Sequence, residues 1–174
     1  MEGWHEESIG RHHDRKAFDC GSRELNEYLE RYARQNHESG GAKTFVAVFL
    51  AQPQHILGFY SISPSSIEFA RVPEKLTKKL GRYDVPVFRL GRLAIDRSVQ
   101  RQGLGADLLL AAGERALAVA AEVGGIALAI DAKDARAARW YERFGAITLH
   151  DEPLKLVLPL SVIADAIAAA KKRR

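Results

Sequence analysis

The run Arg92–Ala112, RLAIDRSVQRQGLGADLLLAA, holds the residues whose types and spacing are best suited to bind a phosphate group. Apolar residues alternate as in a strand, Gly103 and Gly105 then form a turn, and helical spacing follows. Glycines at a strand-to-helix turn leave the amides of the turn and of the first helical residues open, an arrangement that binds phosphate. Residues 100–105 are therefore a candidate phosphate loop.

The residues around these glycines distinguish three types of phosphate loop. A Walker loop requires Lys-Ser or Lys-Thr after its last glycine, where Ala106 and Asp107 stand. A Rossmann fingerprint requires a third glycine at the position of Leu108. Both types are excluded, and the pattern Gln/Arg-x-x-Gly-x-Gly/Ala remains.

Tyr141, in the run AARWYERFG, is the candidate for proton transfer. A phenol has a pKa near 10, so it stays protonated at neutral pH and can donate a hydrogen bond to a developing anion. The alternative is a core aromatic that packs beside Trp140 and Phe144.

Other chemistries have less support in the sequence. His12, His13 and Asp14 are adjacent, and adjacent residues rarely converge on one ion, so we predict no metal site. Cys20 is the single cysteine and is interpreted as a small core residue. No serine lies in a Gly-x-Ser-x-Gly elbow, which excludes that hydrolase arrangement.

The elements that must position these residues form a mixed α/β pattern, with an antiparallel start and one central βαβ crossover. A helix over 22–35 has Ser22 as its N-cap and a buried face of Leu25, Tyr28, Leu29 and Tyr32. Further helices are predicted at 73–80, 105–122, 134–144 and 161–172. Strands are predicted at 43–50, 56–70, 85–96, 125–132, 146–151 and 154–160, with 51–55 as a hairpin loop.

The composition is that of one globular domain over residues 1–174, with 47% hydrophobic residues and a net charge of +4. No apolar run reaches the roughly 20 residues that span a bilayer, and the first residues do not resemble a targeting peptide, so the cytoplasm is expected. The segment from Arg71 to Arg101 contains nine basic residues and three acidic residues. This segment is either a solvated basic surface or a contact for a polyanion.

The loop pattern resembles the acetyl-CoA pyrophosphate loop of the GNAT N-acetyltransferases, and the order of elements is similar to that family's mixed sheet with two splayed strands. The resemblance implies that acetyl-CoA is the co-substrate and that the preceding strand and the loop bind it. The implied contacts are Leu93, Ala94, Ile95, Gln100, Arg101, Gln102, Gly103, Leu104, Gly105 and Ala106. The asparagine that commonly contacts the cofactor is missing from the run Asp131–Ala135, where Asp131 and Asp134 are expected to favour a helix N-terminus.

A narrower resemblance rests on LNEYLERYARQN, ILGFYSIS, LGRLAID, QGLGADLLLAA and ARWYERFG. These runs look like those of the TacT/AtaT-type acetyltransferase toxins of type II toxin–antitoxin modules. That resemblance implies acetylation of the amino group of an aminoacyl-tRNA, which blocks translation, with Tyr141 as the general acid. It also implies a homodimer and a ribbon-helix-helix antitoxin.

A tRNA acceptor would give the basic segment a role, because Lys and Arg neutralise backbone phosphates without regard to sequence. Lys75, Lys78, Lys79 and Arg82 can share one face of the short helix, and Arg89 and Arg92 should point to opposite sides of their strand. Two other functions remain open. One is a GNAT enzyme that acts on a small amine or a protein N-terminus, and the other is an inactive module that binds acyl-CoA or nucleic acid.

Overall fold

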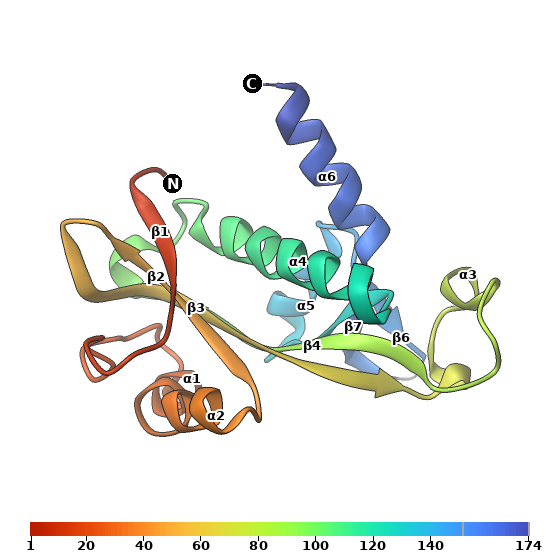
Figure 1. The fold of residues 1–174 in the computed structure, drawn as a ribbon, viewed down its shortest axis with the longest axis horizontal. Helices are drawn as coiled ribbons and strands as arrows, with labels where there is room; N and C mark the ends of the chain where they lie inside the picture. Colours follow the sequence, from red (N-terminus) through yellow and green to blue (C-terminus); the bar gives the residue numbers. More distant parts are fainter. Residues whose placement is uncertain (151, 174) are drawn as a thin grey trace. The chain divides into compact units, whose positions relative to one another are not determined.

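A computed structural model describes residues 1–150 and 152–173 of the chain (Figure 1). The strands are β1 (Trp4–Ser8), β2 (Lys43–Phe49), β3 (Gln52–Ile67), β4 (Val85–Ile95), β5 (Ala127–Asp131), β6 (Ile147–Leu149) and β7 (Glu152–Pro159). The α-helices are α1 (Arg23–Glu27), α2 (Ala33–Ser39), α3 (Glu74–Thr77), α4 (Leu104–Val123), α5 (Ala135–Glu142) and α6 (Leu160–Lys172). A π-helix, η1 (Tyr28–Tyr32), and two 3-10 helices, η2 (Phe69–Arg71) and η3 (Arg97–Val99), complete the order.

The chain divides into two compact units, and β4 and α4 each contribute residues to both. The first unit contains residues 1–63 and 91–111, and the second contains 64–90 and the described residues from 112 onward. The mixed α/β class predicted from the sequence is confirmed, including the β4–α4–β5 crossover between parallel strands. Among the described residues, no helix is both long and apolar enough to cross a membrane.

In the first unit, the strands follow the order β1-β2-β3-β4. The sequence pattern missed β1, whose run WHEES is polar, because pairing with β2 and not apolar alternation makes it a strand. The predicted loop over 51–55 is also wrong, since β3 begins at Gln52 and only two residues connect it to β2. A bulge in the β2–β3 register accommodates Pro53, which cannot donate a ladder hydrogen bond.

The predicted helix over 22–35 is confirmed at its start, where the Ser22 side chain accepts a hydrogen bond from the Leu25 amide. It continues as α1, η1 and α2, because the Ala33 amide donates to the Tyr28 carbonyl five residues earlier. Leu29 and Ala33 are fully buried, whereas Tyr32 is 52% exposed. The burial predicted for Tyr32 is therefore wrong.

The second unit takes its strands in the order β4-β5-β7-β6. Val85, Val87, Ala127 and Val157 form its core with residues of β3, η2 and β6. The predicted helix over 161–172 is confirmed as α6, and Ile163 packs so closely on Gly113 of α4 that a Cβ there would lie 2.6 Å from it. Asp151, the last residue of the strand predicted at 146–151, lies outside the described residues.

Candidate active site

The candidate phosphate loop runs from the end of β4, through η3, to the first turn of α4 in the first unit. Asp96 fixes its start, because its Oδ1 accepts from the Ser98 amide at 3.0 Å and its Oδ2 from the Asp19 amide at 3.0 Å. Burial alone would raise the pKa of Asp96, but these hydrogen bonds and the Ser98 hydroxyl hold it below its usual value. The carboxylate therefore stays charged and rigid at neutral pH.

Gln100 anchors the loop with its side chain. Its Nε2 donates to the Ile95 carbonyl at 2.9 Å and to the Cys20 carbonyl at 3.0 Å. The glutamine of the motif thus ties the loop to the end of β4, and its amide nitrogen is engaged within the protein. This assigns Gln100 a positioning role in the loop.

The loop reverses direction through two residues with positive φ, Arg101 at 62° and Gly103 at 88°. A Cβ at Gly103 would meet no atom closer than 3.8 Å, so the backbone conformation, and not crowding, favours glycine there. Gly105 is already the second residue of α4. The positive φ of Arg101 had no signal in the sequence, because arginine rarely adopts this conformation.

The first turn of α4 provides the hydrogen-bond donors of the loop. The amides of Leu104, Gly105 and Ala106 have no acceptor within the helix, because they lie in its first turn. The first amide with an acceptor is that of Asp107, which donates to the Gly103 carbonyl at 3.1 Å. Free amides at the positive end of a 20-residue helix favour an anion such as a pyrophosphate.

Leu93, Ala94 and Ile95 form the last residues of β4, in the same unit as the loop. Ala94 is buried in the core beside Tyr28 and Phe59, whereas Leu93 and Ile95 are half-buried. The Gln100 side chain already bonds the Ile95 carbonyl. The groups suited to an acyl oxygen are therefore those amides of this segment that do not pair with β3.

Tyr141 lies on α5 in the second unit and is 8% exposed. Its ring packs edge to face on Trp140 at a centroid distance of 4.9 Å. Burial raises the pKa of Tyr141, so the hydroxyl keeps its proton well above neutral pH. Within residues 1–150 and 152–173 the hydroxyl makes no hydrogen bond, so it remains available as a donor.

The helix predicted over 73–80 is shorter in the structure, where α3 is a single turn that ends at Thr77. No helix therefore holds all of Lys75, Lys78, Lys79 and Arg82 on one face. All four side chains are exposed, and the last three follow the helix in an irregular segment. Short helices are only marginally stable on their own, and two adjacent lysines add no apolar contact that would extend this one.

Arg89 and Arg92 of β4 differ in their surroundings. Arg89 donates from Nε and Nη2 to Asp131 Oδ2, at 3.0 and 2.6 Å, at the edge of a hollow of about 180 Å³ in the second unit. The expected role of Asp131 at a helix N-terminus is therefore wrong, because it ends β5 and pairs with Arg89. Asp134 does cap α5, where it accepts from the Ala137 amide at 2.8 Å.

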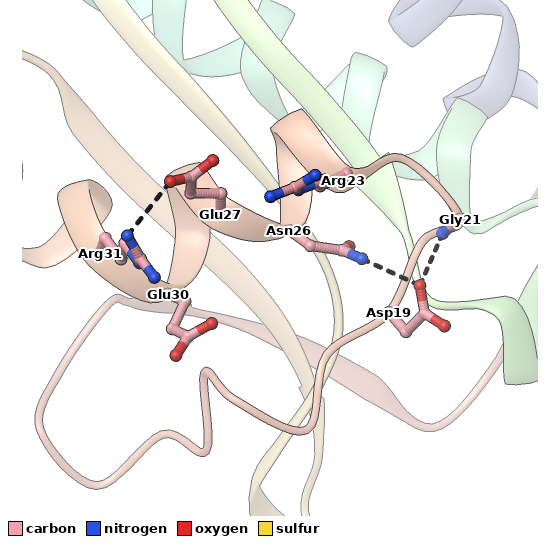
Figure 2. A pocket seen from close by; sticks show the side chains of 7 residues that line it. All are labelled: Asp19, Gly21, Arg23, Asn26, Glu27, Glu30 and Arg31. Atoms are coloured by element: carbon pink, nitrogen blue, oxygen red, sulfur yellow. Dashed lines mark hydrogen bonds and ion pairs between the residues drawn. The ribbon is translucent and has the colours of Figure 1, made fainter.

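The outer face of α1 and η1 borders a second hollow, of about 450 Å³, in the first unit (Figure 2). Some of its polar groups pair with one another: Arg31 pairs with Glu27 at 3.3 Å, and Asp19 accepts from Asn26 Nδ2 and the Gly21 amide, both at 2.9 Å. The Asn26 side chain, followed by the Gly21 amide, holds the pKa of Asp19 below its usual value. This hollow could not be predicted from the sequence, because its residues converge from a loop and a helix.

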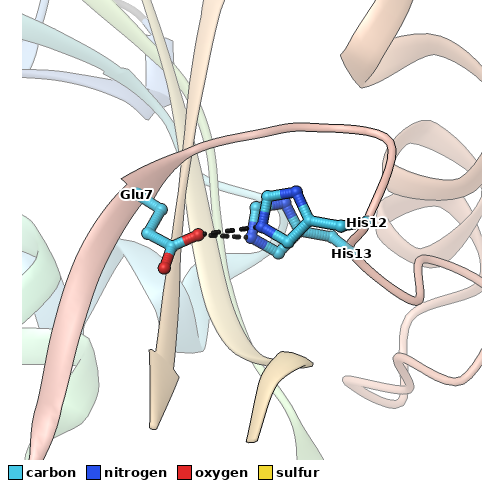
Figure 3. A group of neighbouring side chains, drawn as sticks. All are labelled: Glu7, His12 and His13. Carbon is cyan, nitrogen blue, oxygen red and sulfur yellow. Dashed lines mark hydrogen bonds and ion pairs between the residues drawn. The ribbon is translucent and has the colours of Figure 1, made fainter. Parts of the chain in front are cut away.

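His12 and His13 come together with Glu7 in the first unit, although the adjacent His12, His13 and Asp14 were not expected to converge (Figure 3). His12 Nε2 and His13 Nε2 lie 3.1 and 3.0 Å from the same oxygen of Glu7. However, His13 Nδ1 accepts from the Gly10 amide at 2.9 Å, which places the ring proton on Nε2. A metal on Nε2 would require a proton on Nδ1 facing that amide, so the geometry favours a hydrogen-bonded cluster over a metal centre.

Comparison with known proteins places this geometry in context. The family model "Acetyltransferase (GNAT) domain" matches residues 41–145. A tRNA-acetylating toxin of Mycobacterium tuberculosis is 32% identical over 145 residues, which is 83% of this chain and 85% of that protein.

The toxin AtaT has a similar structure in three solved complexes. AtaT complexed with acetyl-methionyl-tRNAfMet matches with a TM-score of 0.87 and 28% identity, over 94% of this chain and 99% of that one. An AtaT mutant bound to the C-terminus of the antitoxin AtaR matches with a TM-score of 0.82 and 26% identity, over 95% and 98% of the chains. AtaTR bound with acetyl-CoA matches with a TM-score of 0.81 and 26% identity, over 96% and 99%.

Proposed function

Because the chain belongs to the GNAT acetyltransferase family, we propose that it is a toxin that transfers the acetyl group of acetyl-CoA to the amino group of an aminoacyl-tRNA. The observation that carries this proposal is the open turn between β4 and α4, which lies inside the matched GNAT region. The acceptor follows from the relatives, one named for tRNA acetylation and another complexed with an acetylated aminoacyl-tRNA.

The proposed cofactor contacts divide by chemistry. The amides of residues 101–106 bind the pyrophosphate at the N-terminus of α4, and Gln100 holds the loop in place. The backbone of Leu93, Ala94 and Ile95 contacts the arm that carries the thioester, and its amides stabilise the oxyanion that forms on the acetyl carbonyl.

The transfer itself makes modest demands on the protein. An α-amino group has a reference pKa near 8, and an ester neighbour lowers it, so part of the acceptor is neutral at physiological pH. The neutral nitrogen attacks the thioester carbon, the carbon–sulfur bond breaks, and the nitrogen releases its proton to water. Tyr141 donates its hydroxyl proton to the departing thiolate and regains a proton from solvent.

The remaining proposals concern assembly and location. We infer that residues 1–174 act as one catalytic domain, because β4 and α4 run through both compact units. The antitoxin complex of AtaT supports an antitoxin as partner, which we propose to be of the ribbon-helix-helix type. We further propose a homodimer that acts in the cytoplasm, where charged tRNA is found.

The decisive experiment is mass spectrometry of the amino acids released from total charged tRNA after incubation with acetyl-CoA and the protein. We expect one or a few amino acids to gain an acetyl group. Parallel reactions with free amino acids, polyamines and an N-terminal peptide test the small-amine and protein alternatives. Acetylation of those acceptors alone would replace the tRNA proposal.

A further inference from the structure

Arg92 lies over an aromatic ring in the first unit. Its Cζ is 3.6 Å from the ring centroid of Tyr28, within the range of a strong cation–π contact. The ring itself is held firmly, since it stacks on Phe59 at 6.4 Å, and its hydroxyl accepts from Asn36 Nδ2 at 3.4 Å. The guanidinium therefore rests on a fixed platform.

Arg92 differs from the other half-buried arginines of the described chain in having no acceptor. Arg15 donates to the Glu30 carbonyl, Arg34 and Arg71 pair with glutamates, and Arg115 also has a partner. Within residues 1–150 and 152–173, Arg92 makes neither a hydrogen bond nor an ion pair. A partly buried charge without an acceptor is costly, which points to an acceptor that arrives with a ligand.

The orientation of Arg92 fits such a ligand. A guanidinium that stacks through its face keeps its five N–H donors in its plane, in the fork that matches a phosphate. None of its nitrogens is fully buried, so the fork reaches solvent. Arg92 also directly precedes Leu93 on β4, the first of the residues proposed to contact the cofactor arm.

Tyr32 supplies an aromatic surface one turn away. It closes the π-helix that Tyr28 opens, and four residues of either α or π geometry return a side chain to nearly the same side of a helix. Tyr32 is 52% exposed, although Tyr28 is buried. Tyr32 therefore lies one helical turn from the ring that carries Arg92. An exposed tyrosine and a cation are the two groups that single-stranded nucleic acid uses, through base stacking and a phosphate contact.

We propose that Arg92 and Tyr32 form a binding site for the single-stranded 3′ end of an RNA acceptor. The Arg92 fork takes a phosphodiester near the terminal nucleotide, and Tyr32 stacks on a base. This inference rests on the proposed function and narrows it, since it separates Arg92 from Arg89, which donates from Nε and Nη2 to Asp131.

The test is fluorescence anisotropy with a 5′-labelled, uncharged RNA that ends in ACCA. We expect Arg92→Gln to weaken binding by about 10- to 100-fold, since a charge-assisted bidentate contact is lost. Arg92→Lys keeps the positive charge but loses the bidentate fork, so it should weaken RNA binding less than Arg92→Gln does. Tyr32→Leu should weaken binding by about 10-fold, and Tyr32→Phe should not. Arg89→Gln is the matched control on the same strand and should change binding less than about 3-fold.

Two further measurements separate a site from a structural contact. The melting temperature and the acetyl-CoA affinity of each variant should match those of the wild type. For Arg92→Gln, KM should rise for aminoacyl-tRNA but not for an aminoacyl-adenosine, which has no phosphodiester. The proposed site is refuted if Arg92→Gln and Tyr32→Leu bind the RNA like the wild type. It is also refuted if KM rises equally for aminoacyl-tRNA and for the aminoacyl-adenosine.

The outcomes also distinguish this site from the proposed function. Wild-type protein that binds the RNA through Arg92 and Tyr32, but acetylates no charged tRNA, would overturn the function and leave the site. If the wild-type protein acetylates charged tRNA and both variants bind the RNA normally, the proposed function stands and the proposed site is refuted.

Discussion

Tyr141→Phe should separate catalysis from binding. The change removes one oxygen from a side chain that is 8% exposed, and its hydroxyl has no hydrogen-bond partner within residues 1–150 and 152–173. The ring and its contact with Trp140 remain, so the free energy of unfolding should change by less than about 1 kcal/mol. Loss of a general acid lowers turnover by roughly 10²- to 10⁴-fold, or about 3 to 5 kcal/mol in the activation free energy.

The assay is single-turnover acetylation of charged tRNA at saturating acetyl-CoA, with calorimetry for acetyl-CoA affinity and a thermal melt for stability. Burial raises the pKa of Tyr141, so the wild-type rate should show no loss from ionisation of this tyrosine up to about pH 10. Trp140→Phe is the matched control, because it alters the neighbouring packing and keeps the hydroxyl. A rate for Tyr141→Phe within a few-fold of wild type would refute the general-acid role.

Three further predictions concern the loop, the basic residues and the histidine cluster. Gly103→Ala should lower acetyl-CoA affinity about 10-fold in calorimetry, because a φ of 88° costs a residue with a side chain about 1–2 kcal/mol. Gly105→Glu should abolish binding, because it places a negative charge at the phosphate site. Unchanged affinity in folded protein would contradict the assignment of the phosphate loop. Lys78→Glu with Arg82→Glu should raise KM for charged tRNA and flatten its salt dependence without changing acetyl-CoA affinity, and a salt dependence identical to wild type would make these residues a solvated surface. Thermal melts should show stability falling below pH 6.5 and again below 4.5. Burial lowers the pKa of His13, so the unfolded chain gains that proton first. Hydrogen bonds from His5 and His12 lower the pKa of Glu7 to about 2. Glu7→Gln should cost roughly 1–2 kcal/mol at pH 7 and should make the lower step smaller.

The turn proposed as the phosphate loop could be placed between β4 and α4 from the sequence, because glycine spacing, a strand and a helix all act locally. Gly103 requires its conformation whatever packs around it, and Asp134 caps α5 through an amide three residues away. The backbone fixes such features over a few residues. Tyr141 needed the family resemblance, because its helix alone fits a core aromatic equally well.

Features that depend on distant residues could not be predicted in this way. The apolar spacing of Leu25, Tyr28, Leu29 and Tyr32 fits an ordinary α-helix. Only the folded chain shows the Ala33-to-Tyr28 hydrogen bond of the π turn and the exposure of Tyr32. The basic residues Arg89 and Arg92 look equivalent in sequence as well. Asp131 and Tyr28, which lie 42 and 64 positions away respectively, give them different partners.

The few catalytic groups that the reaction requires indicate where selectivity for tRNA arises. An aminoacyl ester brings an amine that is already partly neutral, so the protein needs an acid and an oxyanion donor but no strong base. Any neutral amine that reached the thioester could then react, and chemistry alone would not select tRNA. Selection must come from the groups that hold the acceptor, such as an arginine fork without an internal acceptor and an exposed aromatic ring. On this reasoning, Arg92 and Tyr32 variants should lose discrimination between charged tRNA and small amines before they lose the ability to transfer acetyl groups.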